Sequence, residues 1–549
     1  RCDTGHTGAS PEKLPNDLHL QWSLALPPLE RAWPDDERLE FDIAYEPIVA
    51  TDTLYLGSPH NDAVMAFDAG SGAERWRFHT EGPIRFAPAI ANGLLYAGSD
   101  DGFLYCLDAA SGSLRWRFQA ALSNRKVLGN ARMISVWPVR GAPVVADGTV
   151  YFAAGIWPFE GVCVYALDAA TGAVRWLHDN YDVKFMLQPH HSPAFAGMAP
   201  QGYLTLCGDN LLVPNGRAPA ACLDRKTGRL LYYELDANNR YGDYRIAARD
   251  RFYINPGALY QLETGRNLGA FPSTVVMTGG TIVGMDHDRL RAFDASTIEA
   301  VSDTDSKKRT TWKWQAPELW SFPCQASNFI MAGNRLYGCR PGFVFAIDPP
   351  PNGGEPGVVW EAEVEGHPVR LAAANGRLYV STLEGRIHCF GAKKQAAIVM
   401  DASNSKTTPG DATALAKVRA ILEATGVSEG YALLPDIGNG ELAAALARES
   451  QLHIVGAGPD KAVSAARGML DASGLYGVRV ALIEGDFEDL SLPPYFAGLA
   501  VLAEVGDDFA ASKERVSKLY ECLRPYGGSA CMAAGRNTAE ILEKTVAGA

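Results

Sequence analysis

The sequence predicts a β-propeller of eight four-stranded blades, followed by a doubly wound α/β domain. Three observations support this: a repeat within residues 1–391, a composition rich in turn residues, and a later change to alternating strands and helices. At 549 residues the chain exceeds what one hydrophobic core usually serves. Its 55 glycines, 33 prolines and 47% hydrophobic residues suit a turn-rich, well-buried β protein, and 21% charged residues exclude global disorder.

The internal repeat carries an Asp, a Gly and a Trp at constant spacing, as in AFDAGSGAERWRF, CLDAASGSLRWRF and ALDAATGAVRWLH. Each unit alternates strands with Asn-Gly or Asp-Gly and Asp-x-x-Ser/Thr-Gly turns, which is typical of a four-stranded blade. The Asp can accept N–H groups of the turn, the Gly supplies a positive φ, and the Trp can wedge between blades, so a structural role is expected. The strongest copies hold Asp68, Gly72 and Trp76, then Asp108, Gly112 and Trp116, then Asp168, Gly172 and Trp176.

The last unit, at 367–391, has inner strands and no outer one. Residues 20–26 (LQWSLAL) can supply the missing strand, which would place Trp22 at the position of the repeat Trp and remove a free sheet edge. We therefore expect a propeller over 1–391, a linker over 392–411 and an α/β domain over 412–549. The other blades are expected at 41–79, 83–119, 139–179, 192–235, 244–270, 271–315 and 321–365.

The repeat resembles the tryptophan-docked blades of quinoprotein dehydrogenases, which bind pyrroloquinoline quinone, and of the outer-membrane assembly lipoprotein. The opening RCDTGHTGAS resembles the Arg-x-Asp-x-x-x-Thr-Gly-x-Ser that begins many such propellers after a Trp-Pro-x-Phe stretch. That stretch is absent, so native residues, including any signal peptide, are expected upstream. The resembled enzymes stack their quinone on a disulfide between adjacent cysteines and hold Ca²⁺ nearby, but no two of the ten cysteines are adjacent.

The α/β part resembles S-adenosylmethionine-dependent methyltransferases over residues 431–535. Asp486 in EGDFEDLSLP matches the adenine-side acid, and Gly438 and Gly440 match two glycines of the cofactor turn, with Asp436 where the first glycine is expected. Gly458 stands where an acid should hold the ribose, and loss of such a charged acceptor costs roughly 1.5–3 kcal/mol. We expect a degenerate, non-catalytic domain, truncated at its C-terminal edge; a gapped alignment with Asp436 as the acid leaves S-adenosylmethionine binding open.

Four long loops are expected on one face of the propeller, where blade connections open. They would gather Arg and Trp side chains that suit an anionic or aromatic ligand. No catalytic residue and no metal site is predicted, because the adjacent histidines in this set point oppositely on an extended chain. The predicted ligand residues are Arg132, Trp137, Arg140, Trp157, Gln188, His190, His191 and Arg217.

The predicted function is a binding or scaffold module of the periplasm or another extracytoplasmic compartment, with a protein or small-molecule partner. A net charge of −13 argues against nucleic acid, and no apolar run is long enough for a transmembrane helix. The alternatives are a quinoprotein oxidoreductase and an S-adenosylmethionine-dependent methyltransferase, since both catalytic constellations are incomplete but present in outline. The pairs Cys207/Cys222 and Cys324/Cys339 flank turns and are either disulfides or buried thiols.

Overall fold

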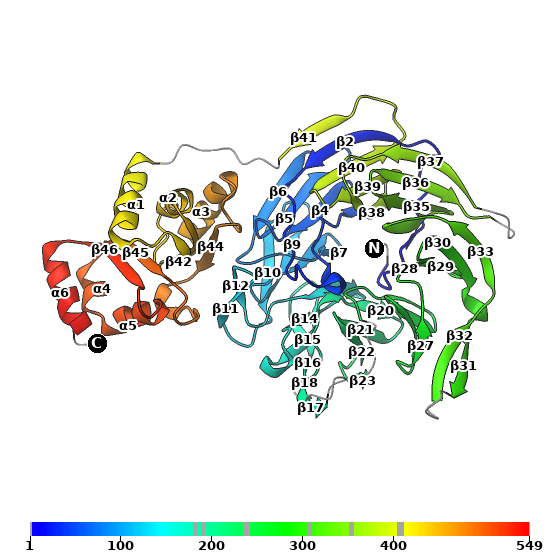
Figure 1. The fold of residues 1–549 in the computed structure, drawn as a ribbon, viewed down its shortest axis with the longest axis horizontal. Helices are drawn as coiled ribbons and strands as arrows, with labels where there is room; N and C mark the ends of the chain where they lie inside the picture. Colours follow the sequence, from blue (N-terminus) through cyan, green and yellow to red (C-terminus); the bar gives the residue numbers. More distant parts are fainter. Residues whose placement is uncertain are drawn as a thin grey trace.

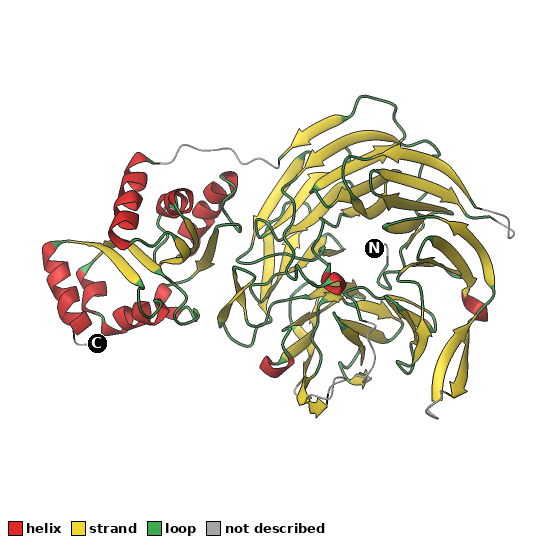
Figure 2. Ribbon diagram, viewed as in Figure 1, coloured by secondary structure: helices red, strands yellow, loops and turns green. Residues whose placement is uncertain are grey.

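The computed structural model describes residues 3–180, 184–187, 193–233, 242–304, 310–350, 356–402 and 411–547. Eight antiparallel sheets stand around a central channel, and an α/β domain lies beside the ring (Figure 1). Strands make up nearly all of the propeller, whereas the α-helices belong to the C-terminal domain (Figure 2). The eight-bladed propeller predicted from the repeat is therefore confirmed.

Blades one to four follow the predicted units, each running from an inner strand at the channel to an outer strand at the rim. Their strands are β3 (Ile48–Ala50), β4 (Thr53–Ser58), β5 (Ala63–Asp68) and β6 (Glu74–His79); β7 (Ala89–Ala91), β8 (Leu94–Gly98), β9 (Phe103–Asp108) and β10 (Leu114–Gln119); β13 (Gly141–Ala146), β14 (Thr149–Ala154), β15 (Val162–Asp168) and β16 (Val174–Asn180); β20 (Thr205–Cys207), β21 (Asn210–Asn215), β22 (Ala218–Asp224) and β23 (Leu230–Tyr232).

Blades five to eight complete the ring, and the N-terminal strand β2 is the outer strand of blade eight. Their strands are β24 (Ala247–Arg249), β25 (Phe252–Asn255), β26 (Ala258–Gln261) and β27 (Asn267–Ala270); β28 (Thr274–Met277), β29 (Thr281–Asp286), β30 (Arg289–Asp294) and β33 (Glu318–Pro323); β34 (Asn328–Ala332), β35 (Arg335–Arg340), β36 (Phe343–Asp348) and β37 (Gly357–Glu363); β38 (Pro368–Ala374), β39 (Arg377–Thr382), β40 (Arg386–Gly391) and β2 (His19–Ala25).

Blade six differs from its predicted span of 271–315. Its outer strand is β33, and residues 299–315 instead form a separate hairpin of β31 (Glu299–Thr304) and β32 (Thr310–Gln315). The reason lies in the turn after β30. Asp294 is followed by Ala-Ser-Thr-Ile with no glycine, so the chain enters a short 3-10 helix, capped by Asp294, and leaves the sheet before returning.

The remaining short strands of the propeller lie outside the four-stranded pattern. They are β1 (Ala9–Ser10), the hairpin of β11 (Lys126–Gly129) and β12 (Arg132–Ser135), the hairpin of β17 (Lys184–Leu187) and β18 (Pro193–Ala196), β19 (Gly202–Tyr203), and β41 (Ile398–Asp401), which pairs in parallel with β2 within the residues expected to be linker.

The outer-strand tryptophans Trp76, Trp116 and Trp176 are each seated on the repeat glycine of the next blade, and Tyr232 takes this place on Gly265. A Cβ on Gly112 would lie 2.5 Å from the ring of Trp76, and one on Gly172 would lie 3.0 Å from Trp116. These glycines also have positive φ, +72° and +73°. The repeat therefore requires this glycine for two reasons: its positive φ in the turn, and the absence of a side chain where the indole packs. Trp22 closes the ring in the same way, against Gly72 of blade one.

The N-terminal segment runs through the channel and binds four inner strands in turn. The backbone carbonyls of Thr4, Gly5, Thr7 and Gly8 accept the N–H groups of one residue each in blades four to seven, at 2.8 to 2.9 Å. The N-terminus accordingly lies at the centre of the ring in Figure 1. The two parts of the N-terminal region thus have different tasks: residues 4–10 line the channel, and β2 is the outer strand that closes the ring.

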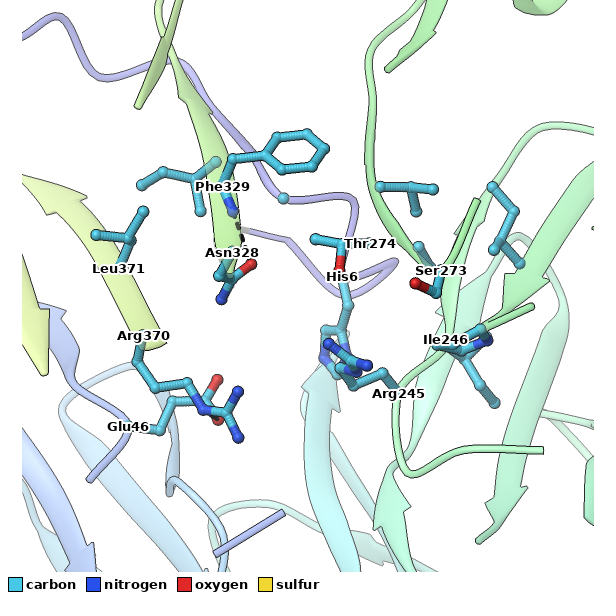
Figure 3. A pocket seen from close by; sticks show the side chains of 16 residues that line it. His6, Glu46, Arg245, Ile246, Ser273, Thr274, Asn328, Phe329, Arg370 and Leu371 are labelled. Carbon is cyan, nitrogen blue, oxygen red and sulfur yellow. Dashed lines mark hydrogen bonds and ion pairs between the residues drawn. The ribbon is translucent and has the colours of Figure 1, made fainter. Parts of the chain in front are cut away.

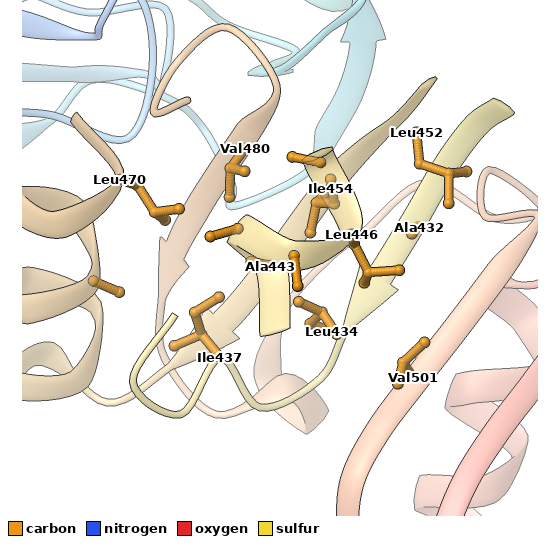
Figure 4. Close-up of a cluster of buried hydrophobic side chains, with 14 of the residues drawn as sticks. Ala432, Leu434, Ile437, Ala443, Leu446, Leu452, Ile454, Leu470, Val480 and Val501 are labelled. Atoms are coloured by element: carbon orange, nitrogen blue, oxygen red, sulfur yellow. The ribbon is translucent and has the colours of Figure 1, made fainter. Parts of the chain in front are cut away.

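The C-terminal domain is a five-stranded parallel sheet in the order β44-β43-β42-β45-β46 with helices on both faces, a doubly wound arrangement. One face packs against α1, α2 and α3 through the apolar cluster of Figure 4. Its elements are α1 (Ala412–Thr425), β42 (Glu429–Leu434), α2 (Glu441–Glu449), β43 (Gln451–Gly458), α3 (Asp460–Ala472), β44 (Val480–Glu484), β45 (Leu499–Val505), α4 (Asp507–Ala511), α5 (Lys513–Cys522), β46 (Ser529–Ala534) and α6 (Arg536–Ala547).

The nine described cysteines are free thiols, including both pairs for which a disulfide was left open. The strand register explains this, because Cys207 faces Asn210 and Cys339 faces Asn328, so neither pair stands directly opposite across a ladder. Burial raises the pKa of the Cys222 thiol to about 12, which keeps it protonated near neutral pH.

We predict that Trp22→Ala destabilises the propeller by roughly 3–5 kcal/mol, the scale of buried aromatic truncations. Trp22 is 0% exposed and its indole N–H donates to the carbonyl of Ala69 at 3.2 Å. Urea unfolding followed by circular dichroism measures the loss, and Trp22→Phe, which retains a ring on Gly72, should lose less.

Deletion of residues 1–27 removes the closing strand and the channel segment together, so we expect aggregation, measured by light scattering. A deletion variant that melts like the full chain would contradict ring closure at this seam.

Candidate functional site at the mouth of the propeller channel

A segment between β2 and β3, residues 28–46, covers part of one mouth of the channel. Phe41 stacks on Phe86 of blade two, with ring centroids 4.7 Å apart, and packs with Ala87 and Ala142 from blades two and three. Asp42, within the same segment, is buried and accepts from the backbone N–H of Ala32 at 2.9 Å. We call residues 28–46 the plug. It occupies the mouth on the side of blades two to four.

One position in each blade forms the rim of this mouth, five residues before the first turn residue of the inner hairpin. Where the plug sits, the position is alanine in blades two and three, which leaves room for Phe41. In the other blades it is polar or aromatic. In blade order the position holds Glu46, Ala87, Ala142, Tyr203, Arg245, Thr274, Asn328 and Arg370.

The polar rim residues of blades five to eight, with Glu46, line a cavity of about 120 Å³ at the uncovered side of the mouth. Figure 3 shows Arg370 and Glu46 side by side, with Arg245 and His6 across the cavity from them. Ile246, Ile330 and Leu371 add apolar wall. The wall is mixed in character, and its two guanidinium groups, with the carboxylate of Glu46 beside one of them, suit a carboxylate or another planar anion that binds both arginines.

Arg370 is the more buried of the two cavity arginines, at 7% exposure. Its Nη2 donates to the hydroxyl of Tyr244 at 2.9 Å and to the carbonyl of Glu40 at 3.1 Å. Its Nε is buried without a hydrogen-bond partner and lies 3.8 Å from Oε2 of Glu46. Burial acts to lower the pKa of Arg370, but Tyr244 and Glu46 outweigh it and raise that pKa, so the side chain stays charged.

Arg245 faces the same cavity with its side chain 34% exposed. Asp243 holds it by an ion pair of 3.1 Å, and the guanidinium lies over the ring of Tyr244 at 5.0 Å. Burial opposes the charge, whereas Asp243 and Tyr244 raise the pKa of Arg245. Arg245 is therefore a fixed, permanently charged group whose remaining donors are available to a ligand.

Arg140, predicted as a ligand residue, belongs to a buried ionic chain under the plug. Its Nε and Nη2 donate to the two carboxylate oxygens of Asp100 at 2.9 and 2.8 Å, and Arg85 binds the same Asp100 at 2.6 Å. Arg85 also pairs with Asp42 of the plug. At 1% exposure, Arg140 anchors the plug rather than presenting a fork to solvent. Burial opposes ionisation of Asp100, but the two arginines lower its pKa to about 2.

The other predicted ligand residues lie apart from one another. Trp137 is 7% exposed, donates to the carbonyl of Glu160 at 2.8 Å and packs with the half-buried Trp157. Arg217 is exposed and forms an ion pair of 3.1 Å with Asp36. Gln188, His190 and His191 lie outside the described residues. The structure thus brings Trp137 and Trp157 together and places Arg217 on another part of the surface; their ligand role stays a prediction.

Arg132 belongs to a hairpin that contacts the C-terminal domain. Strands β11 and β12 form this hairpin, and Leu128 and Met133 from it pack into the apolar cluster on one face of the α/β sheet. Lys126 donates its backbone N–H to Ser491 of the connection between β44 and β45 at 2.9 Å. Arg132 itself pairs with Asp62 and donates to the carbonyl of Pro59 at 3.0 Å. The first long loop is thus a docking element between the domains.

A second set of contacts joins blade one to the C-terminal end of α3. Asp471 accepts from Arg77 at 2.6 Å and from Asn61 at 2.9 Å, and His79 lies 3.1 Å away. Burial would raise the pKa of Asp471, but His79 and Arg77 lower it to about 2, so the carboxylate is ionised over the physiological range. The interface is therefore polar at this edge and apolar at the hairpin.

We predict that Gly477→Val separates the two domains. Gly477 has a φ of +79°, and a Cβ there would lie 2.4 Å from the carbonyl oxygen of His60. Gly426→Val is the matched control, because Gly426 has a φ of +67° and nothing within 4 Å of its Cβ. The control should lose only about 1–2 kcal/mol for the backbone conformation. In calorimetry, Gly477→Val should add a separate low-temperature transition for the α/β domain; equal melting of both variants would contradict docking at this contact.

Asp101 gives the same interface a pH dependence. Burial raises its pKa to about 6, with Lys126 opposing and Glu81 reinforcing the shift. An unfolded aspartate titrates near pH ~3.9, so the contribution of the protonated carboxyl to stability is complete below about pH 4 and is lost as the pH rises through about 6. We predict that the stability of Asp101→Asn relative to the native chain rises over this pH range, because the amide stays neutral while the native carboxyl ionises. Urea unfolding at several pH values should show a slope of up to about 1.4 kcal/mol per pH unit; a constant difference would contradict it.

The candidate cofactor residues of the α/β domain do not form a binding crevice for S-adenosylmethionine. Asp436 uses its carboxylate to accept the N–H of Gly438 at 2.9 Å within its own turn. The side chain of Ile437 packs on Gly458, where the ribose-binding acid is missing. Gly440 begins α2 and packs against α3, and Asp486 is exposed. No family model matches the α/β domain, so its likeness to the methyltransferases stays a prediction, and no methyl-transfer step is derived.

A quinone cofactor also lacks its expected ligands. The sequence has no adjacent cysteines, and the described residues contain no group of three or more His, Cys, Asp and Glu side chains that could hold a metal ion. The plug places Phe41 over part of the channel mouth, and Asp42 and Asp100 neutralise Arg85 and Arg140 there. The residues present therefore do not fit the quinone and its Ca²⁺, and no redox step is derived.

Eight four-stranded blades around a channel define a β-propeller, and its repeats within residues 36–253 are similar to PQQ-like repeats. The family model described as outer membrane protein assembly factor BamB matches residues 36–137 and 60–253. No curated protein matches the sequence. None of the described helices combines the length and apolar character that crossing a membrane requires.

Solved structures with which the chain aligns include BamB from Moraxella catarrhalis, at 16% identity over 68% of this chain and 100% of that one, with a TM-score of 0.44. Quinohemoprotein alcohol dehydrogenase ADHIIG from Pseudomonas putida HK5 aligns at 14% identity over 76% and 84%, with a TM-score of 0.44. A europium-containing methanol dehydrogenase aligns at 12% identity over 71% and 97%, with a TM-score of 0.47. The fold assignment rests on the strand pairing rather than on these alignments.

Proposed function

We propose that this chain is a non-catalytic binding and scaffold module of the bacterial envelope, periplasmic or otherwise extracytoplasmic. In this proposal the uncovered part of the channel mouth recognises an acidic group of a partner protein or small molecule. The observation that carries it is the pair of arginines, Arg245 and Arg370, on one small cavity. Their guanidinium groups would pair with a ligand carboxylate.

Two further observations support a binding role. The family matched over the first half of the propeller is described as an outer membrane protein assembly factor, which supports an envelope setting and protein partners. The described charged side chains near the mouth hold the plug in place and hold the two domains together. They do not form a pair of a nucleophile and a general base. A quinoprotein oxidoreductase and a methyltransferase remain the alternatives, and no described set of residues favours either.

We also propose the accessible members of the predicted loop-face set as a secondary contact area for the partner. Arg217 is 66% exposed, and Trp157 is half-buried beside Trp137. Arginine forks and tryptophan faces are frequent anchors in protein interfaces. Arg132 and Arg140, by contrast, are proposed to act only through the domain interface and the plug.

We predict that Arg245→Gln and Arg370→Gln each weaken binding of a carboxylate ligand by about tenfold or more, because each removes a charged donor from the cavity. The measurement is calorimetric titration of the full chain with succinate, citrate and a blocked tetraglutamate peptide. Arg251→Gln is the matched control, since Arg251 lies on an exposed turn of the same blade as Arg245. Thermal melts establish that each variant is folded.

Arg370→Lys separates charge from geometry, because lysine keeps the positive charge but loses the planar fork. We expect intermediate affinity. Failure of all three probes to bind the native chain, or equal binding by the Arg245 and Arg370 variants, would contradict an anion site at the channel mouth.

A further inference from the structure

The row of inner-strand N–H groups facing the channel is only partly covered by the chain itself. The residue two before the first turn residue of each inner hairpin defines this row. The two residues that flank a two-residue turn exchange both backbone hydrogen bonds. The residue one step further from the turn on the inner strand therefore points its N–H away from the partner strand. In this propeller that direction is the channel. The row consists of Val49, Ile90, Val145, Leu206, Ala248, Met277, Met331 and Ala373.

Blades four to seven show how the row is used. Leu206, Ala248, Met277 and Met331 donate to successive carbonyls of the N-terminal segment at 2.8, 2.8, 2.8 and 2.9 Å. All four residues are buried beneath that segment, at 3, 2, 2 and 9% exposure. The segment spans four blades with the five residues from 4 to 8, and its backbone turns at His6 and Gly8, which have φ of +51° and +71°.

Among the described residues, no segment covers the same row in blades one to three. Val49, Ile90 and Val145 are each only half-buried, in contrast to their equivalents. All three line one cavity of about 270 Å³, together with Asp3, Thr4 and His6 from the N-terminal segment. The cavity is thus continuous with the place where the segment leaves blade four. Prolines, alanines and aliphatic side chains make up most of its wall: Pro88, Pro143, Ala50, Ala87, Ala89, Ile48 and Val144.

We propose that this open half of the channel binds an extended peptide segment of a partner protein, with small or apolar side chains. One carbonyl of the peptide accepts from each of the N–H groups of Val49, Ile90 and Val145, as the carbonyls of residues 4–8 do in blades four to seven. This is strand addition to exposed inner edges, in which backbone hydrogen bonds supply affinity and the narrow apolar wall selects small side chains. The site is separate from the arginine cavity of the proposed function, which is formed by blades five to eight with Glu46.

Proline substitution tests the N–H groups one at a time. Ile90→Pro removes only a channel-facing donor, because the N–H of Ile90 makes no bond to the neighbouring strand, and edge positions of this kind tolerate proline. Ile90→Ala is the matched control, since it trims the side chain and keeps the N–H. Val145→Pro provides the same test in blade three should Ile90→Pro lower the melting temperature.

The probe is a blocked, fluorescently labelled peptide with the sequence of residues 3–10, Asp-Thr-Gly-His-Thr-Gly-Ala-Ser, added to the full chain. We expect saturable binding by anisotropy, loss of at least tenfold in affinity with Ile90→Pro or Val145→Pro, and less than threefold change with Ile90→Ala. Hydrogen exchange with mass spectrometry should show slower exchange at residues 46–51, 87–92 and 143–147. Absence of saturable binding at millimolar peptide, equal binding by the proline variants, or protection confined to blades four to seven would overturn the proposal.

Discussion

The seating of an aromatic ring on a glycine is the interaction on which closure of the ring depends. A propeller has no continuous core, so each blade is held by its neighbours, and this contact recurs at the successive joints from blade eight to blade five. The last joint is formed by residues far apart in the chain, Trp22 and Gly72. That contact converts an open stack of sheets into a closed ring. It also fixes the mouth of the channel, because the plug continues directly from β2 to blade one.

The plug makes the two halves of an otherwise repetitive ring chemically different. On one side the rim residues Ala87 and Ala142 are small, and Phe41 fills the space they leave. On the other side the rim residues are long and charged, and a cavity remains. Asymmetry of function in a symmetric fold therefore comes from where a single non-repeat segment lies. The same reasoning applies within the channel, where the N-terminal segment covers the inner strands of blades four to seven and not those of blades one to three.

The repeat spacing was sufficient to predict seven of the blades and the closing strand, because Asp, Gly and Trp each have a physical task that fixes their position. It failed at blade six, where the missing glycine after Asp294 sends the chain into an added hairpin. The site was harder. Arg245 and Arg370 were visible in the sequence at one repeat position, but long loops drew attention to Arg132 and Arg140. Loop length cannot distinguish a ligand-binding loop from one that docks a second domain, since both need exposed ends and a few buried anchors.

Strand β41 has a mechanical consequence. It lies in parallel register on β2, its Met400 also reaches Gly72, and the chain leads from it to the α/β domain. A force on the α/β domain would therefore first load the docking contacts on blades one and two and then act on β41. Because β41 covers the very strand that closes the ring, a pull strong enough to strip it would leave β2 as an outermost strand at the seam. The segment that joins the domains therefore covers the joint at which the ring closes.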